Sequence, residues 1–249
     1  MTNCDQASIK TAGLIIIGNE ILSGKTQDQN SFFLATELQS LGVSLIRISV
    51  IPDDLVMISR EAALFSGAFD FVFTTGGVGP THDDITMSGI AKAFGVQLIR
   101  HPVLERTFHE RYGKAANDAI MKMAEVPEGA EIVKFGTNNF PLVVFKNIYI
   151  FPGIPRYLQE KFTLVRERFR TSEFFVKRIY LRANEADIAA ILNAVVEKNE
   201  CVTFGSYPIL GNDDYQIIVT AESKIRADLH KSLEELLQKL PQDIIVKVA

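Results

Sequence analysis

The residues best suited to chemistry lie at positions 73–86, FTTGGVGPTHDDIT, directly after an apolar run. Three of them are glycines that let the backbone approach a ligand closely or adopt positive φ: Gly76, Gly77 and Gly79. A glycine-rich turn that leads into a helix presents backbone N–H groups, which suit a phosphate. Asp83 and Asp84 follow, and because bare carboxylates repel a phosphate, a divalent cation between them resolves the conflict. The stretch therefore predicts a site for a phosphate and a metal ion.

The two aspartates are expected to have different roles, because neighbouring residues do not share a helix face. One of them can cap the following helix while the other meets metal or water. In the alternative interpretation, both merely complement the helix dipole. His82 can donate to a phosphate oxygen, although a lone histidine is more often structural, and we place Thr81 beside it among the substrate-binding residues.

Two further stretches follow apolar runs and carry candidate residues. In GNEILSGKTQDQN, Glu20 can help to hold a hard cation or act as a base, or it can be a capping or surface acid. Asn30 can cap the next helix and can also face the ligand. In FPGIP, Gly153 lets the backbone come close to a ligand, or the turn is purely structural. Gly24-Lys25-Thr26 resembles the end of a P-loop, but five residues separate Gly18 from Gly24 where that motif has four.

The elements around these stretches predict an α/β fold with a mostly parallel sheet and helices on both faces. Strands at 13–18, 44–51 and 69–75 alternate with amphipathic helices, which is typical of βαβ units. Residues 101–124 indicate one broken helix, and 140–153 indicate a hairpin turning at Lys146-Asn147. Ligands of open parallel sheets bind at the carboxyl ends of the strands, where the three candidate stretches lie.

The order of the elements changes after about Ser172. The remaining sequence predicts β-α-β-β-α-β, a small split-βαβ subdomain. We therefore expect two domains, residues 1–172 and 173–249. The second domain lacks the GxxG loop with which RNA-binding KH modules clamp a backbone, so we interpret it as a packing and dimerisation element.

The overall composition limits the classes of partner. The chain has 249 residues, a net charge of −4 and a pI near 5.7, which do not favour nucleic acid or an anionic membrane. The first residues lack the pattern of a secretory signal, and no apolar run has transmembrane length. We expect a cytoplasmic protein.

Four motifs, in order, resemble one family: GNEILSGKTQDQN, TTGGVGPTHDD, FPLVVFKNIYIFPGIP and GSYPILGNDDYQ. They are similar to the molybdopterin-binding fold shared by MogA, gephyrin and CinA proteins. Within this fold they most resemble the molybdopterin-binding-like region of eukaryotic FAD synthase, followed by a KH-like subdomain. The resemblance does not include the PAPS-reductase-like synthase domain, so we do not expect FAD synthesis from this chain.

The resemblance implies metal-dependent cleavage of a nucleotide pyrophosphate. The expected substrate is FAD, cleaved to FMN and AMP, or ADP-ribose. The implied cofactor is a divalent ion, Mg²⁺ or Co²⁺, assisted by K⁺. From the residues themselves we expect Asp83 or Asp84 to hold this ion or to orient the attacking water, and Glu20 to be a further ligand or a base. The family also implies a homo-oligomer. Two alternatives stay open, namely molybdopterin binding with adenylyl transfer in molybdenum cofactor assembly, and a non-catalytic flavin or pterin binder.

Overall fold

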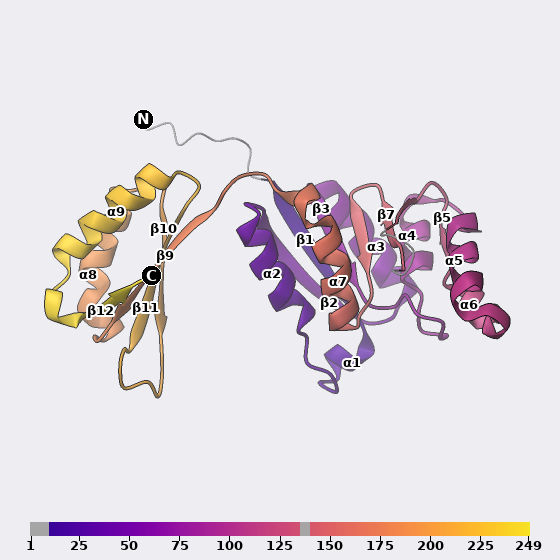
Figure 1. The fold of residues 1–249 in the computed structure, drawn as a ribbon, viewed down its shortest axis with the longest axis horizontal. Coiled ribbons are helices and arrows are strands. Elements are labelled where there is room, and N and C mark those ends of the chain that lie inside the picture. The colour runs from indigo at the N-terminus through magenta and orange to yellow at the C-terminus, as the bar shows by residue number, and fades with distance from the viewer. Residues whose placement is uncertain (1–9, 135–139) are drawn as a thin grey trace. The chain divides into compact units, whose positions relative to one another are not determined.

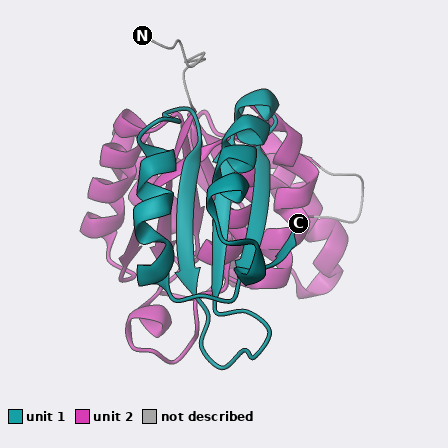
Figure 2. Cartoon of the chain, turned by 90° about the vertical axis from the view of Figure 1, so that its left-hand side faces the viewer, with its two compact units in different colours: residues 1–8, 172–249 teal, residues 9–171 magenta. Residues whose placement is uncertain are grey.

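The computed structural model describes residues 10–134 and 140–249, which divide into two compact units, 10–171 and 172–249 (Figures 1 and 2). The first unit contains a six-stranded sheet in the order β2-β1-β3-β8-β7-β6. Its strands are β1 (Thr11–Ile17), β2 (Ser44–Ile51), β3 (Phe71–Thr75), β6 (Glu131–Val133), β7 (Leu142–Phe145) and β8 (Ile148–Phe151). Pairings β2-β1, β1-β3 and β3-β8 are parallel, and β6 and β7 add an antiparallel edge. The predicted mostly parallel sheet is confirmed.

Helices cover both faces of this sheet, as predicted (Figure 1). On one face, α2 (Asn30–Ser40) and α7 (Pro155–Val165) bury Leu34, Leu38 and Phe162 against Leu14 and Phe73. On the other face, α3 (Leu55–Ala68) and α4 (Thr86–Phe94) contribute to a second apolar cluster. Alternate residues of β1 enter opposite clusters because successive side chains of a strand point to opposite faces. This double coverage leaves the strand ends as the places where polar groups can gather.

Local signals fix where most of these helices begin and end. The Asp54 carboxylate accepts the N–H groups of Val56 and Met57, which makes it the cap of α3. Gly95, at φ 64°, ends α4 in the left-handed conformation. Asn30, by contrast, is the first residue of α2 and not its cap. Its own N–H group is accepted by Asp28, whose carboxylate holds the start of that helix.

Several short elements were not predicted. They are α1 (Asn19–Leu22), β6, and the two-stranded ribbon of β4 (Leu98–Arg100) and β5 (Glu125–Pro127). Segments of three or four residues are too short for periodicity to indicate them. The broken helix expected at 101–124 is α5 (Pro102–Tyr112), a 3-10 turn and α6 (Asp118–Lys122), with β5 beginning just beyond it. Helix α7 is regular to Val165 and is followed by a 3-10 turn over Arg166–Phe169.

The C-terminal unit has the predicted β-α-β-β-α-β order. It consists of β9 (Phe175–Leu181), α8 (Glu185–Val196), β10 (Thr203–Pro208), β11 (Ile217–Ser223), α9 (Arg226–Lys239) and β12 (Ile245–Val248). The sheet is antiparallel in the order β10-β11-β9-β12, and Figure 2 shows both helices side by side on one of its faces. Ile179, Val219 and Leu233 are buried between the helices and the sheet. Within the described part of the chain, no helix is long and apolar enough to cross a membrane.

Candidate functional site

The carboxyl ends of β1, β3 and β8 meet at one edge of the parallel sheet. Gly76 follows β3, and its N–H group donates to the Phe151 carbonyl at the end of β8 over 3.3 Å. Its φ is 103°, and a Cβ atom on Gly76 would lie 2.0 Å from the Ile17 carbonyl oxygen at the end of β1. A Cβ on Gly153 would lie 3.3 Å from the Gly76 Cα. Glycine at position 76 is therefore required by the close approach of three backbone segments.

Asn30 joins the three loops that leave these strands. Its side-chain amide donates to the Thr75 hydroxyl and to the Gly153 carbonyl, each over 2.8 Å. Thr75 in turn donates to the Pro152 carbonyl over 3.0 Å. The Asn30 side chain is buried, and its Oδ1 atom has no hydrogen-bond partner among the described residues. The structure thus brings together Asn30, Gly76 and Gly153, which the sequence predicted separately as substrate-binding residues.

The glycine loop is anchored at both ends and open between them. Thr86, the first residue of α4, donates its hydroxyl to the Gly76 carbonyl over 2.8 Å and its N–H to the Gly77 carbonyl over 3.0 Å. Gly77 has φ 62°. Within residues 10–134 and 140–249, the N–H groups of Gly77, Val78 and Gly79 have no acceptor. Unpaired N–H groups of this kind can bind the oxygens of a phosphate.

Asp84 closes the loop on itself and does not cap α4. Its Oδ2 atom accepts the Thr81 N–H over 2.8 Å and lies 2.7 Å from where a Cβ on Gly79 would be. The residue before α4 is Ile85, which provides no side-chain cap. The expectation that one aspartate caps this helix is therefore wrong, because the turn at 81–84 directs the Asp84 carboxylate back toward Thr81.

The Thr81 hydroxyl lies between the two carboxylates. Its Oγ1 atom is 2.5 Å from Asp83 Oδ1 and 2.6 Å from Asp84 Oδ2. A hydroxyl carries one proton, so only one of these contacts is a hydrogen bond, and the other brings two acceptor oxygens together. Mg²⁺ is commonly bound by one or two carboxylates together with substrate phosphates. Since a cation would relieve the crowding of oxygens, the three residues fit a small, hard divalent ion.

Asp83 is the more solvent-exposed of the two aspartates. The hydrogen bond from the Thr81 hydroxyl, and then that from its own backbone N–H, lower the pKa of its carboxyl below the usual value. His82 and Lys122 contribute in the same direction by their charges. Asp83 therefore remains ionised at neutral pH and is available to a cation or a water molecule.

Lys122, which the sequence analysis did not select, reaches this loop from α6. Its ammonium group donates to the Thr81 carbonyl, 41 residues earlier in the chain. It places one positive charge next to the acidic turn. His82 is almost fully exposed, and its Nδ1 atom is 3.9 Å from Asp83 Oδ1. The Lys122 contact could not be derived from spacing, because the position of α6 depends on tertiary packing.

Glu20 lies in α1, between β1 and α2. Its side chain is exposed, and its carboxylate folds back over Gly18, where a Cβ would meet Oε1 at 2.6 Å. Asp53, which follows β2, accepts the Asn19 N–H over 2.9 Å and so fixes the start of α1. Among the residues that the structure describes, no three histidine, cysteine or acidic side chains gather as a metal site. The role of Glu20 as a metal ligand or base stays a prediction.

Comparison with family models covers nearly the whole chain. Residues 13–171 match the model of the probable molybdopterin binding domain, and residues 173–249 match that of the FAD synthase middle domain. The join between the two matches coincides with the division between the two compact units.

Individual proteins show the same relationship. A protein of Archaeoglobus fulgidus is 35% identical over 226 residues, which are 90% of this chain and 96% of that protein. A probable FAD synthase of Caenorhabditis elegans is 34% identical over 260 residues, which are 92% of this chain and 50% of that protein. The chain thus spans about half the length of the FAD synthase. A crystal structure of CinA, of unknown function, from Thermoplasma acidophilum superposes with a TM-score of 0.60 and 28% identity, over 65% of this chain and 100% of that one.

Proposed function

Since the chain belongs to the molybdopterin binding domain family and continues into an FAD synthase middle domain, we propose that it hydrolyses the pyrophosphate of FAD to give FMN and AMP. ADP-ribose, which has the same linkage, is the second substrate of this class. One arrangement carries the proposal: the unpaired N–H groups of Gly77, Val78 and Gly79 lie on the same loop as the paired carboxylates of Asp83 and Asp84. Phosphate binding and cation binding are thereby combined on one loop.

In this mechanism the chain's residues position the pyrophosphate and the water. The glycine-loop N–H groups bind non-bridging phosphate oxygens and stabilise the negative charge that grows during attack. Asp83 is ionised and exposed, so it orients the attacking water and takes part in holding the cation. A bound Mg²⁺ or Co²⁺ supplies further charge stabilisation at the phosphorus. The water oxygen bonds to one phosphorus and gives up a proton to a carboxylate, for which we propose Glu20 as the base, while the bridging P–O bond breaks and the leaving phosphate takes the electron pair.

The remaining site residues keep this loop in place. Asp84 holds the turn by accepting the Thr81 N–H. Asn30 fixes the loop's origin relative to Gly153. We propose Glu20, in α1 after β1, as a further ligand or base, and K⁺ as an accessory ion. We also propose that the chain works as a homo-oligomer in the cytoplasm.

The test is product analysis with purified protein. FAD, ADP-ribose and NADH are each incubated with Mg²⁺ or Co²⁺, with and without K⁺, and the products are separated by chromatography. We expect FMN and AMP from FAD, with turnover in Asp83→Asn reduced at least about 100-fold because charge stabilisation and water positioning are lost. The matched control is Asp213→Asn/Asp214→Asn, an exposed pair of adjacent aspartates in the C-terminal unit, which should keep full turnover.

Two outcomes would contradict hydrolysis, and a third would contradict the role of the acidic loop in it. Transfer of an adenylyl group to a pterin, without release of FMN, would assign the chain to molybdenum cofactor assembly. Tight binding of FAD without turnover under every metal condition would make it a non-catalytic flavin binder. Equal turnover in Asp83→Asn and wild type, with unchanged circular dichroism, would remove the acidic loop from the mechanism.

A further inference from the structure

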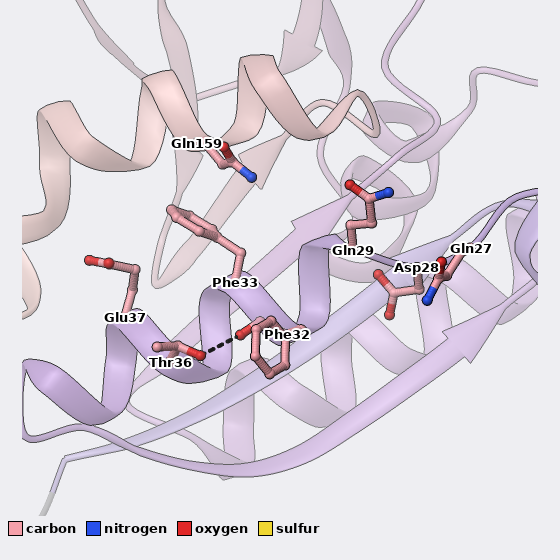
Figure 3. Close-up of a pocket in the computed structure, with 8 residues that line it drawn as sticks. All are labelled: Gln27, Asp28, Gln29, Phe32, Phe33, Thr36, Glu37 and Gln159. Atoms are coloured by element: carbon pink, nitrogen blue, oxygen red, sulfur yellow. Dashed lines mark hydrogen bonds between the residues drawn. The ribbon is translucent and has the colours of Figure 1, made fainter. Parts of the chain in front are cut away.

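A groove of about 440 Å³ lies between α2 and α7, beside the candidate site (Figure 3). Its walls begin at the two loops that Asn30 joins: α2 starts at Asn30 itself, and α7 starts at Pro155, two residues after Gly153. The groove is therefore tied to the same edge of the sheet as the glycine loop. Its volume is within the range of small-molecule sites, which is roughly 300–1,000 Å³.

Three glutamine side chains line the groove with carboxamides that are available to a ligand. Gln27 and Gln29 lie on the loop before α2, and Gln159 points from α7 toward α2 in Figure 3. In the described part of the chain, none of these three side chains takes part in a hydrogen bond. Each carboxamide offers both donors and an acceptor, the combination with which asparagine and glutamine recognise the edge of adenine.

Two carboxylates line the groove, and among the described residues each uses only one of its two oxygen atoms for a hydrogen bond or ion pair. Asp28 uses Oδ1 to accept two backbone N–H groups, and Glu37 uses Oε2 for its ion pair with Arg166. Asp28 Oδ2 and Glu37 Oε1 are not engaged among the described residues. The lining contains no lysine, arginine or histidine. This charge pattern disfavours a phosphate and favours a neutral group that donates hydrogen bonds.

Two phenylalanines supply flat apolar surface. Phe33 is held edge-on against Phe162, with ring centroids 5.7 Å apart, and forms a fixed wall. Phe32 is 78% exposed, so its ring face is free to stack on a ligand at the mouth of the groove. Thr36 is not available to a ligand as a donor, because its hydroxyl donates to the Phe32 carbonyl. Stacking on an aromatic side chain contributes about 1–3 kcal/mol per base in nucleic-acid complexes.

We infer that this groove binds an amino-substituted nitrogen heteroaromatic ring, which is the ring chemistry of adenine and of a pterin. The amino group donates to Asp28 or Glu37, the carboxamides pair with ring nitrogens, and Phe32 stacks on the ring face. The choice between adenine and a pterin rests on the proposed function. With that function, the ring is the adenine of FAD, and the pyrophosphate of FAD extends along α2 toward the glycine loop. An isoalloxazine ring fits less well, because its two carbonyl groups would face carboxylates.

The test is equilibrium binding by isothermal titration calorimetry, with AMP, a pterin and riboflavin as separate probes. The variants are Gln29→Leu and Phe32→Ala, with Gln97→Leu and Leu210→Ala as matched controls at exposed positions elsewhere. We expect Kd for AMP to rise at least about 10-fold in Gln29→Leu and Phe32→Ala and to stay unchanged in the controls. If binding of the pterin weakens as much as binding of AMP, the groove recognises the ring chemistry that the two share. If only binding of AMP weakens, the groove is specific for the nucleotide.

Other outcomes overturn the inference, and they are distinguishable from failure of the proposed function. Wild-type protein that binds neither AMP nor the pterin, or variants that bind both as tightly as wild type, would remove the groove as a ring site. The same follows if only riboflavin binding weakens. Because binding needs no turnover, loss of AMP binding in the variants supports the groove even if FAD is never cleaved. If Gln29→Leu and Phe32→Ala both cleave FAD with an unchanged KM, the proposed function is supported and the groove is not part of the substrate site.

Discussion

The side-chain amide of Asn30 donates a 2.8 Å hydrogen bond to the carbonyl of Gly153, a residue 123 positions later in the chain. The same amide donates to the Thr75 hydroxyl over 2.8 Å. These two bonds hold the loops after β1, β3 and β8 in one arrangement. A buried asparagine that joins two loops by hydrogen bonds fixes their geometry, since its amide has no water within the core to bond to instead.

Asn30→Ala should lower the free energy of unfolding by about 2 kcal/mol, because it leaves the buried Thr75 hydroxyl and the Gly153 carbonyl with fewer partners. It should also lower turnover of FAD, since the glycine loop loses its fixed position relative to Gly153. Urea denaturation and product analysis measure the two effects.

The matched control for this change is Asn193→Ala, at an exposed position in α8. That substitution should change stability by less than about 0.5 kcal/mol. If Asn30→Ala and Asn193→Ala were equally stable and equally active, Asn30 would not organise the strand ends.

Gly76→Ala should destabilise the protein by more than about 3 kcal/mol or prevent folding. The added Cβ would lie 2.0 Å from the Ile17 carbonyl oxygen, and φ is 103°. The Ile17 carbonyl and the backbone of residue 76 both lie at the ends of central strands of the sheet, so neither can move aside. Denaturation monitored by circular dichroism measures the loss.

Gly67→Ala is the opposite case and serves as the comparison. Gly67 lies in the last turn of α3, and a Cβ there would meet nothing within 4 Å. Alanine restricts the unfolded chain and favours the helix, so stability should rise by about 0.5–1 kcal/mol. If both alanine variants had similar stability, the close approach at Gly76 would be wrong.

Much of the fold could be predicted because its signals are local. The alternation of strands and helices was predicted from short stretches of sequence, and the structure confirms it. The cap at Asp54 and the stop at Gly95 also depend on only a few neighbouring residues. The rule that parallel strands end at one edge also anticipated that the loops carrying Asn30 and Gly153 would meet.

Details of the acidic loop could not be predicted, because they depend on turn dihedrals and distant packing. The turn at 81–84 directs Asp84 to the Thr81 N–H, whereas sequence spacing alone made it a candidate helix cap. Lys122 reaches the Thr81 carbonyl only because α6 packs near this loop. The assignment of Asp83 and Asp84 to a metal ion stays a prediction that product analysis tests.

Asp70 should make the protein more stable above pH 4 than at pH 2. Its carboxylate accepts the Lys10 ammonium over 2.6 Å and the Thr11 N–H over 2.8 Å. The Lys10 hydrogen bond, followed by that from the Thr11 backbone, lowers the pKa of Asp70 to about 2. Because the folded-state pKa is below the unfolded value, the stabilisation is present above pH 3.8 and is lost as pH falls through 2.

Asp70→Asn tests this contribution. Since the pair is partly exposed and screened by solvent, the variant should lose about 1 kcal/mol at pH 7 and nothing near pH 2. Urea midpoints of wild type and variant, measured from pH 2 to 7, should therefore converge at the acid end. Asp213→Asn, at an exposed position, is the control and should keep the wild-type curve. Parallel curves for Asp70→Asn and wild type would show that the carboxylate charge contributes nothing.

Lys161 should make stability rise between pH 8 and 10. Its ammonium group donates to the carbonyls of Phe140 and Pro141, but burial lowers its pKa to about 8 from a usual value of 10.5. Below pH 8 both folded and unfolded states carry the proton, and the folded state bears the full desolvation cost. Above pH 8 the unfolded state holds more protons, so unfolding becomes less favourable as pH rises. The rise in stability ends near pH 10, because burial raises the pKa of Tyr149 above its ordinary value of 10.0. Above that pH the folded state keeps the Tyr149 proton that the unfolded state loses, and this lowers stability as pH rises.

Lys161→Met isolates this effect. The variant removes the titrating group and keeps a long apolar side chain, so its urea midpoint should stay flat from pH 8 to 10, where wild type gains about 1–2 kcal/mol. Lys25→Met, at an exposed loop position, should retain the wild-type rise. At pH 7 the variant loses stability with the two hydrogen bonds and gains stability from the removed desolvation cost, so its net change there is not diagnostic. The contribution of Lys161 is identified by the difference between the two proteins in how the urea midpoint changes with pH. A wild-type curve as flat as that of Lys161→Met would mean that the ammonium group is solvated and its pKa is not lowered.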